Sequence, residues 1–200
     1  MEQPPEFAAL TSSPGFLLAR HALLQFGLLL VLLSLFAAAD SWQHLTGWAL
    51  AAGLACVTGF LAGFAVTTVL HEWSHWLGGK LSGGAYTIPA RPGLFVFDWD
   101  FERNSVKQFF TMSIGGNLGG LLALLLLASA VTTDTAGRSA LVAGALASVV
   151  FAAIIEWPVL WRTRASGNPL QELSKIDPAV LKRAALGSLA AGLTGWLTLH

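Results

Sequence analysis

The residues best suited to chemistry in this sequence lie in the run His71-Glu72-Trp73-Ser74-His75. On a helix, residues four apart share one face, so both imidazoles can reach a single metal ion. Histidine nitrogens are common zinc ligands, and Glu72 is placed to take a proton from an activated water. The alternative is a pair of interfacial histidines, with the Glu72 carboxylate extended towards water. We favour the metal site, because ionisable groups inside an apolar segment are costly and usually functional.

The metal site needs a third ligand, because a catalytic zinc usually has three protein ligands and an open position. Glu156 is the best candidate. It lies about six residues from the end of its apolar segment, which at ~1.5 Å per residue matches the depth of the two histidines. A competing interpretation pairs Glu156 with Arg162 or Arg164 at the membrane surface. Asp177 is another candidate ligand, although its place before Pro178 is typical of a helix N-cap.

An amide lies at a similar depth in the apolar segment that follows the histidines. Asn117 comes directly after Gly115-Gly116, and its side chain could hold a substrate carbonyl or help to stabilise an oxyanion. The alternative is a hydrogen bond between helices beside a contact formed by glycines. We therefore predict Glu72 and Asn117 as catalytic residues, and His71, His75 and Glu156 as metal ligands.

The composition places these residues in a membrane protein. Hydrophobic residues make up 54% of the chain and charged residues only 11%, whereas a soluble domain carries about 25% charged residues. Eleven basic residues balance eleven acidic ones, so the chain lacks the basic field that nucleic-acid binding needs. The single cysteine, Cys56, excludes a disulfide framework and a cysteine-rich zinc site. Histidines and carboxylates must therefore supply any metal ligands.

Apolar segments of helical length follow one another along the chain, with no soluble domain between them. A membrane crossing takes roughly 20 apolar residues. We predict an all-α polytopic membrane protein, a single membrane domain over residues 1–200 with about five transmembrane helices. The predicted spans are approximately residues 22–39, 45–77, 109–131, 140–161 and 180–199, of which the last is short.

Glycine spacing predicts which of these helices pack together. Gly59 and Gly63 are four residues apart in the second span, and Gly115/Gly119 and Gly116/Gly120 repeat the spacing in the third. Small residues at this spacing let two helices approach closely in lipid. We expect the second and third spans to be in contact.

The basic residues predict the orientation in the membrane. Alternation of the spans puts the N-terminus, the 78–108 loop and the 162–183 segment on one face. Ten of the eleven basic residues belong to this face, and only Arg138 belongs to the other. Because basic loops mark the cytoplasmic side, we predict a multi-pass protein of the inner cell membrane whose N-terminus and active-site end are cytoplasmic.

The loop before the third span has the pattern of a β-hairpin over approximately residues 85–101. Aromatic residues recur there with a period of two, which is typical of a strand. Arg91-Pro92-Gly93 fits a type II turn, with Tyr86-Thr87-Ile88 as the partner strand. An exposed strand edge of this kind could accept an unwound substrate by strand addition. The aromatic residues are Phe95, Phe97, Trp99 and Phe101.

The histidine motif within a span, the loop with strand character and Gly115-Gly116-Asn117 in the next span together resemble the site-2 protease group of intramembrane zinc metalloproteases. The resemblance covers roughly residues 50–161. It implies a three-helix catalytic core that holds Zn²⁺ and hydrolyses peptide bonds of transmembrane protein substrates within the bilayer. That family usually has Gly-Pro at the glycine pair and takes its third ligand from an Asp-Gly motif. This sequence contains no Asp-Gly, and Glu156-Trp157-Pro158 occupies that region.

Two other functions could use the same residues. A non-proteolytic membrane zinc hydrolase acting on a lipid-linked amide or ester would need a head-group pocket rather than a strand edge. A metal-binding pseudoprotease would bind substrate helices without cleaving them. Glu72 argues against the pseudoprotease, because a chain without catalysis need not keep a carboxylate at this depth. We therefore expect a zinc metalloendopeptidase.

Overall fold

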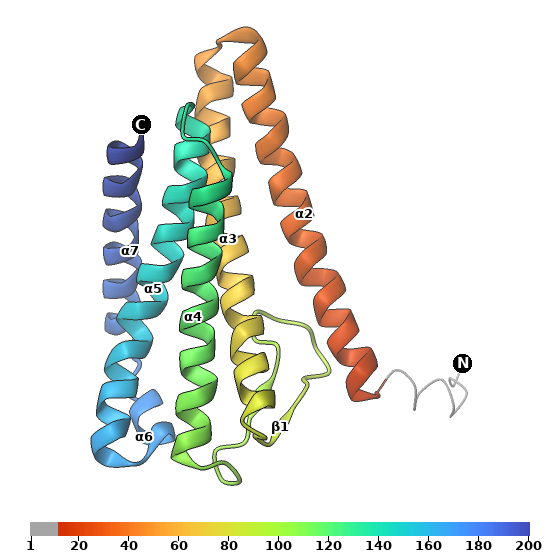
Figure 1. Ribbon diagram of the computed structural model, residues 1–200, viewed down its shortest axis with the longest axis vertical. Helices are drawn as coiled ribbons and strands as arrows, with labels where there is room; N and C mark the ends of the chain where they lie inside the picture. The colour runs from red at the N-terminus through yellow and green to blue at the C-terminus, as the bar shows by residue number, and fades with distance from the viewer. Residues whose placement is uncertain (1–11) are drawn as a thin grey trace.

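The chain folds into a mostly helical bundle, seen here in a computed structural model that describes residues 12–200 (Figure 1). The predicted position of the N-terminus concerns residues outside this range. A two-stranded sheet and a one-turn helix are the other regular elements of the described part. In chain order the elements are α2 (Pro14–Thr46), α3 (Ala49–Leu81), β1 (Tyr86–Thr87), β2 (Asp98–Trp99), α4 (Val106–Ala130), α5 (Ala136–Ser166), α6 (Pro169–Leu173) and α7 (Pro178–Leu199).

Four of the described helices, α2, α3, α4 and α5, are long and apolar enough to cross a membrane. This confirms the prediction of a mostly helical protein with several helices of membrane-spanning length. The fifth predicted span forms α7, which packs along α5. Helix α7 is not one of those four, so its crossing of the membrane remains a prediction.

Local sequence signals set the ends of the helices. Gly47 separates α2 from α3 because it takes a left-handed conformation with a φ of 66°, which favours glycine. Helix α4 begins with a capping box, in which Ser105 accepts from the backbone N–H of Gln108 and the Gln108 side chain accepts from the backbone of Ser105. Asp177 caps α7 by accepting from the N–H of Val180 at 2.8 Å, as predicted.

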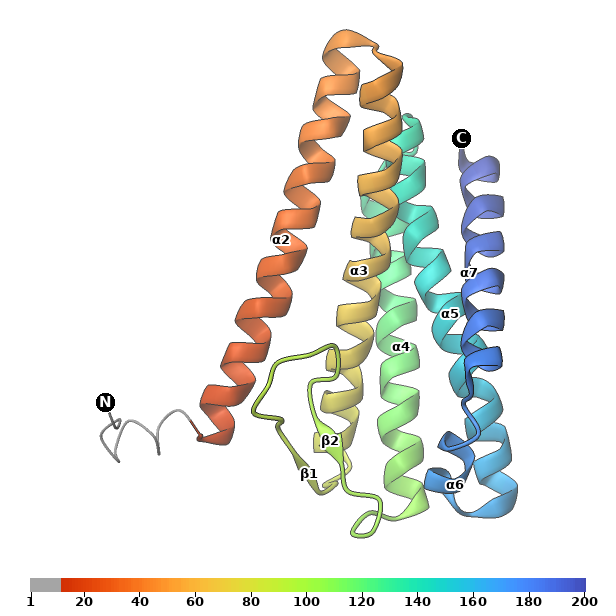
Figure 2. The ribbon, with the colours of Figure 1, turned by 180° about the vertical axis from the view of Figure 1, so that it is seen from behind.

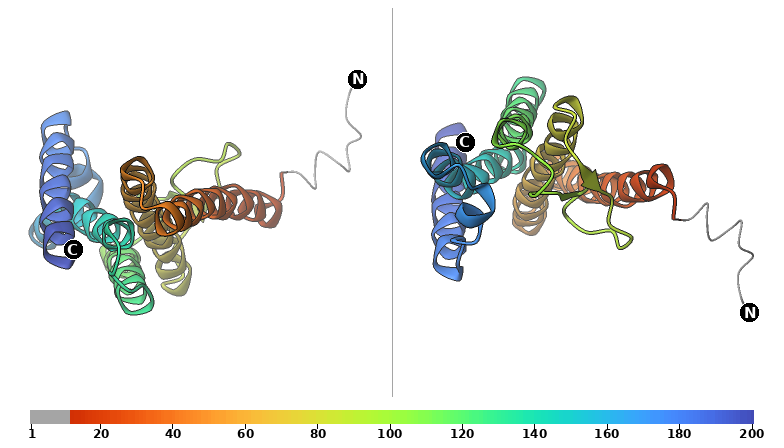
Figure 3. Two further views of the ribbon diagram at one scale, coloured as in Figure 1. Left: turned by 90° about the horizontal axis from the view of Figure 1, so that it is seen from above. Right: turned by 90° about the horizontal axis from the view of Figure 1, so that it is seen from below.

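Helix α3 is the centre of the bundle. It contacts α2 on one side and α4 and α5 on the other, and α7 packs against the outer side of α5. Helix α2 meets α3 at the end where the two are joined, and leans away from it towards the other end (Figures 1 and 2). Seen along the bundle axis, α2 projects away from the other helices (Figure 3).

The glycine contacts correct one part of the packing prediction. Helices α3 and α4 are in contact, and Gly115 of α4 approaches the backbone of Ser74 in α3. However, Gly59 and Gly63 face α5: they lie against the carbonyl oxygens of Gly137 and Leu141. The glycine spacing indicated close contact correctly, but it could not say which neighbouring helix filled the gap.

The loop between α3 and α4 forms less sheet than predicted. The paired residues are Tyr86 with Trp99 and Thr87 with Asp98, in antiparallel register. Gly93 does not have the positive φ that a type II turn requires, so the predicted turn at residues 91–93 is wrong.

The loop departs from a tight hairpin because its middle binds α2. The Gln25 amide donates to the carbonyl oxygens of Gly93 and Leu94 at 2.7 and 2.9 Å, and Arg20 donates to the carbonyl of Ala90. The loop therefore fills the space between α2 and α3 at this end of the bundle (Figure 2).

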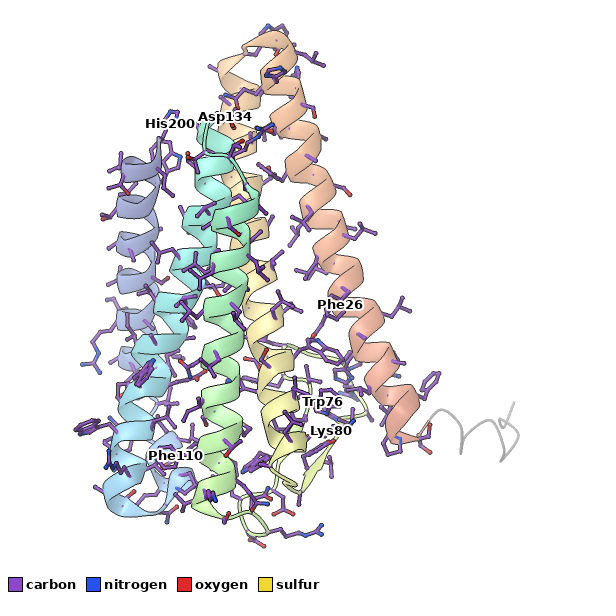
Figure 4. The ribbon with its side chains drawn as sticks, in the orientation of Figure 1. Phe26, Trp76, Lys80, Phe110, Asp134 and His200 are labelled. Carbon is purple, nitrogen blue, oxygen red and sulfur yellow. The ribbon has the colours of Figure 1, made fainter. Side chains whose placement is uncertain are left out.

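The basic residues gather at one end of the bundle. Lys80 and Phe110 lie at the end where α3 finishes and α4 begins, whereas Asp134 and His200 lie at the other (Figure 4). The helix directions put ten basic residues towards the first end, here called the basic end. Arg138 belongs to the opposite end, where it forms an ion pair with Asp40.

Candidate metal centre

His71 and His75 lie one turn apart on α3, in its half nearer the basic end, and both are buried. Their Nε2 atoms are 2.9 Å apart. With Glu72 they form a group whose ligand atoms all lie within 4.8 Å of one another. This group could hold a metal ion, as the motif predicted.

Glu156 reaches the same point from α5. Its Oε1 atom lies 2.7 Å from Nε2 of His71 and 3.2 Å from Nε2 of His75. Among the described residues Glu156 forms no ion pair with Arg162 or Arg164, which was the competing interpretation. Arg162 instead donates to Glu172 at 2.9 Å. Asp177 is occupied as the cap of α7. Of the two candidate third ligands, the structure places Glu156 beside the histidines.

The three converging atoms have a spacing suited to a tetrahedral metal ion. Nε2 of His71, Nε2 of His75 and Oε1 of Glu156 lie 2.7 to 3.2 Å from one another. Ligands about 2.1 Å from a tetrahedral zinc are about 3.4 Å apart, so these three distances would have to open by about 0.2 to 0.7 Å to admit the ion. The donor set fits zinc, which accepts imidazole nitrogen and carboxylate oxygen.

Helix α4 supplies the hydrogen bonds that orient two of these side chains. Nδ1 of His75 lies 3.0 Å from the carbonyl oxygen of Met112. A carbonyl can only accept, so Nδ1 carries the proton and Nε2 offers a lone pair to a metal. The Asn117 amide donates to Oε2 of Glu156 at 2.6 Å and to the carbonyl of Ser113 at 3.0 Å. In this state both amide hydrogens of Asn117 are in use.

Two glycines of α4 make room for the histidines, a feature that the sequence analysis did not identify. A Cβ atom added at Gly116 would overlap the imidazole ring of His75. One added at Gly120 would lie 3.2 Å from Nδ1 of His71. The repeated spacing of the glycines was the available signal, but it was interpreted only as helix packing.

An open cavity of about 420 Å³ adjoins the centre on the side of the basic end. Glu72, His75 and Glu156 lie on its wall. Among the described residues, the Glu72 carboxylate has no hydrogen-bond partner, so it is free to contact a molecule in the cavity. The loop and the start of α4 supply an aromatic part of the wall, and α5 and α6 supply an aliphatic part. The aromatic residues are Phe95, Phe97, Trp99, Phe101 and Phe109.

Three of the four aromatic residues between positions 95 and 101 of the loop also take part in the hydrophobic core. Phe97, Trp99 and Phe101 pack against a cluster that includes Phe109 and Leu160, whereas Phe95 is largely exposed. The predicted period of two thus identified residues that pack on the core, although within residues 95–101 only residues 98 and 99 form a strand. The loop connects the cavity wall to α2 through Gln25.

The three remaining histidines are not part of the group that could hold a metal ion. His44 lies in the last turn of α2. His21 is buried in α2, where its Nδ1 lies 2.9 Å from the carbonyl of Leu17. His200 stacks on Trp196 at the opposite end of the bundle (Figure 4).

Comparisons with protein-family models, with curated proteins and with solved structures found no match to this chain. Its function must be inferred from the residues and geometry of the centre.

Proposed function

We propose that the protein is an intramembrane zinc metalloprotease that hydrolyses peptide bonds of transmembrane protein substrates. One observation carries the proposal: His71, His75 and Glu156 converge from two helices beside a cavity. The wall of this cavity includes Glu72, a carboxylate without a hydrogen-bond partner among the described residues. Structural ion pairs satisfy their carboxylates, whereas a general base must remain accessible to the group that it deprotonates.

The three converging side chains would hold the zinc, and Glu72 would act beside it. Zinc supplies Lewis acidity, which activates water and polarises a carbonyl. Glu72 would accept a proton from the attacking water and deliver it to the leaving amine, so the carboxylate returns to its initial charge. In this proposal Asn117 keeps Glu156 in position through its 2.6 Å hydrogen bond. For Asn117 to contact the substrate, as predicted from the sequence, its amide would have to give up the hydrogen bond to Glu156.

The cavity wall suggests how a peptide would be held. A transmembrane helix must unwind before cleavage, because its carbonyls are already hydrogen-bonded. The loop could accept the extended segment along β2, and the aromatic wall would cover its apolar side chains. With the basic end cytoplasmic, water would reach Glu72 from the cytoplasm. The three-helix core of this enzyme would be α3, α4 and α5.

The test combines zinc content with cleavage in four versions of the full chain in detergent: wild type, Glu72→Gln, Glu156→Gln and Asp177→Asn. Glu72→Gln should keep zinc and lose activity about 10²- to 10⁴-fold, the usual contribution of a general base. Glu156→Gln should lose zinc. Asp177→Asn is the matched control, and it should retain both zinc and cleavage.

Other results would change the assignment. Full zinc occupancy in Glu156→Gln with loss in Asp177→Asn would refute the proposed ligands. Release of product from lipid extracts, without cleavage of a transmembrane peptide, would identify a lipid-directed hydrolase instead. Zinc binding with neither activity would identify a metal-binding pseudoprotease.

A further inference from the structure

A second cavity, of about 450 Å³, lies at the basic end between α5, α7 and the segment of residues 175–177 that connects α6 to α7. Its volume is within the ~300–1,000 Å³ range of ligand pockets. Part of its wall is aliphatic and comes from Ile154, Ile176 and Val180. The charged part carries three cations from three separate segments, namely Arg162, Lys175 and Arg183. A ligand that fits this cavity has an apolar part and an anionic part.

The charges around this cavity remain positive after their partners are counted. Glu172 is buried, and its Oε2 accepts from both Nε of Arg162 and Nζ of Lys175, so two cations share one carboxylate oxygen. Asp177 also lies on the wall, where it caps α7. Among the described residues, Arg183 has no carboxylate partner. Three cations against two carboxylates leave a net positive site.

Two tryptophans indicate the depth of the cavity in the membrane. Trp157 and Trp161 lie on either side of the cavity residue Pro158 in the sequence of α5, and these two residues are 59% and 77% exposed. Exposed tryptophans are enriched at the level of lipid head groups. Arg162 follows Trp161 directly, so the cations lie where phosphates lie in a bilayer. The aliphatic wall at Ile154 is farther along α5 towards the membrane interior.

We propose that this cavity binds one anionic phospholipid. The phosphate would contact Arg162, Lys175 and Arg183, and the first part of an acyl chain would lie against Ile154, Ile176 and Val180. Basic pockets between membrane helices recognise anionic head groups in this manner. A zwitterionic lipid has the same phosphate and chains, but its ammonium group would be repelled by the surplus positive charge.

The bound lipid would also support the metal centre. Ile155 lines both this cavity and the cavity beside Glu72, and it directly precedes Glu156. Pro158 has no N–H, so the helix lacks its usual hydrogen bond to the carbonyl of Ile154 at this position. A ligand packed here would restrict the weakened part of α5 that carries Glu156. The binding proposal itself does not depend on the reaction catalysed.

The test measures lipid binding to the delipidated full chain in a neutral detergent, by native mass spectrometry and by the thermal unfolding midpoint. The probes are phosphatidylglycerol, phosphatidylcholine with the same acyl chains, and inorganic phosphate. Arg183→Gln should bind phosphatidylglycerol about fivefold more weakly, the effect of one interfacial charge. Lys182→Gln removes the same charge from the neighbouring exposed position and should bind as the wild type does, and Arg183→Lys should retain most of the affinity.

Three results would overturn the proposal. Equal binding of the two lipids would show that the anionic head group is not recognised. Equal stabilisation by inorganic phosphate would show an anion site without a lipid. Equal weakening in Lys182→Gln and Arg183→Gln would show diffuse attraction to the basic end. The unfolding midpoint of Arg183→Gln without lipid should match that of the wild type, which separates lost binding from misfolding.

Discussion

Two polar clusters join neighbouring helices, one at each end of the bundle. They differ in how completely their charged groups are paired. At the opposite end Asp40 accepts from Nε of Arg138 at 2.9 Å and from Thr135 at 2.9 Å. Arg138 also donates to Asp134 and Thr132, so every charged group there has a partner. At the basic end, His71, His75 and Glu156 crowd their ligand atoms together, and Glu72 has no hydrogen-bond partner among the described residues.

The difference separates a structural cluster from one that we propose to be reactive. An arginine and carboxylates with complementary geometry stabilise a contact between helices, because each charge meets an opposite one. Two imidazole nitrogens that face each other at 2.9 Å gain little without a shared proton or cation between them. Only the basic-end cluster adjoins a cavity that contains a free carboxylate. The candidate centre is therefore distinguished by a carboxylate that has no partner, and not by the number of its buried polar groups.

The largest effect in this comparison is expected from Gly116→Ala. The new methyl group would overlap the His75 ring and displace it from its hydrogen bond to Met112. Because loss of such supporting contacts weakens metal binding about 10- to 100-fold, zinc titration should show a decrease of that size. Gly53→Ala is the matched control, since a Cβ atom at Gly53 meets nothing within 4 Å. Equal zinc affinity in the two variants would contradict the proposed packing.

Asp40→Asn should affect stability and leave the metal centre unchanged. The substitution removes the charge that faces Arg138, and we expect a loss of about 1–2 kcal/mol in the free energy of unfolding. The loss is smaller than for a fully buried pair because Arg138 is partly exposed. Denaturation in detergent measures it, and zinc content is read on the same samples. Asp134→Asn, at an exposed partner of Arg138, should change stability little.

A loss of zinc in Asp40→Asn would contradict the interpretation that the Asp40 cluster is independent of the metal centre. It would show that the ends of the bundle are coupled through α5, which carries Arg138 near one end and Glu156 near the other. Unchanged zinc with reduced stability would support the interpretation of the Asp40 cluster as a structural contact between α2 and α5.

The sequence predicted the parts of this site that depend on regular periodicity. The four-residue spacing of His71 and His75 fixes a shared face, and the constant rise of a helix placed Glu156 at their depth on a separate segment. These quantities do not depend on which helices are neighbours. The contacts of Gly63 and the course of residues 88–97 do depend on neighbours, so the sequence alone could not determine them.

The role of Asn117 lies between these cases. Its depth in α4 was predicted, but the choice between a substrate contact and a contact between helices depends on the partner that the side chain meets. In the structure that partner is Glu156, because the two helices bring the amide within 2.6 Å of Oε2. Sequence reasoning thus found the residues of the centre more readily than the hydrogen bonds that orient them.

The smallest expected effect is a change in the pH dependence of stability, and it concerns Glu172. Like Asp40, this carboxylate forms ion pairs with basic residues. The hydrogen bond from Lys175 lowers the pKa of Glu172, burial opposes the shift, and the bond from Arg162 adds to the lowering. A carboxylate with a lowered pKa in the folded state stabilises the fold above the pKa of the unfolded state, and this contribution is lost as the pH falls through the folded-state value.

Unfolding midpoints between pH 7 and pH 3 should therefore show wild type more stable than Glu172→Gln at neutral pH, with the difference shrinking below about pH 4, near the ordinary pKa of glutamate. Glu102→Gln, at an exposed position of the loop, is the control and should show no such convergence. A difference that stays constant down to pH 3 would mean that Glu172 acts through packing and not through its charge. In that case Glu172 would not neutralise Arg162 and Lys175, and the proposed lipid cavity would be more positive than these two ion pairs indicate.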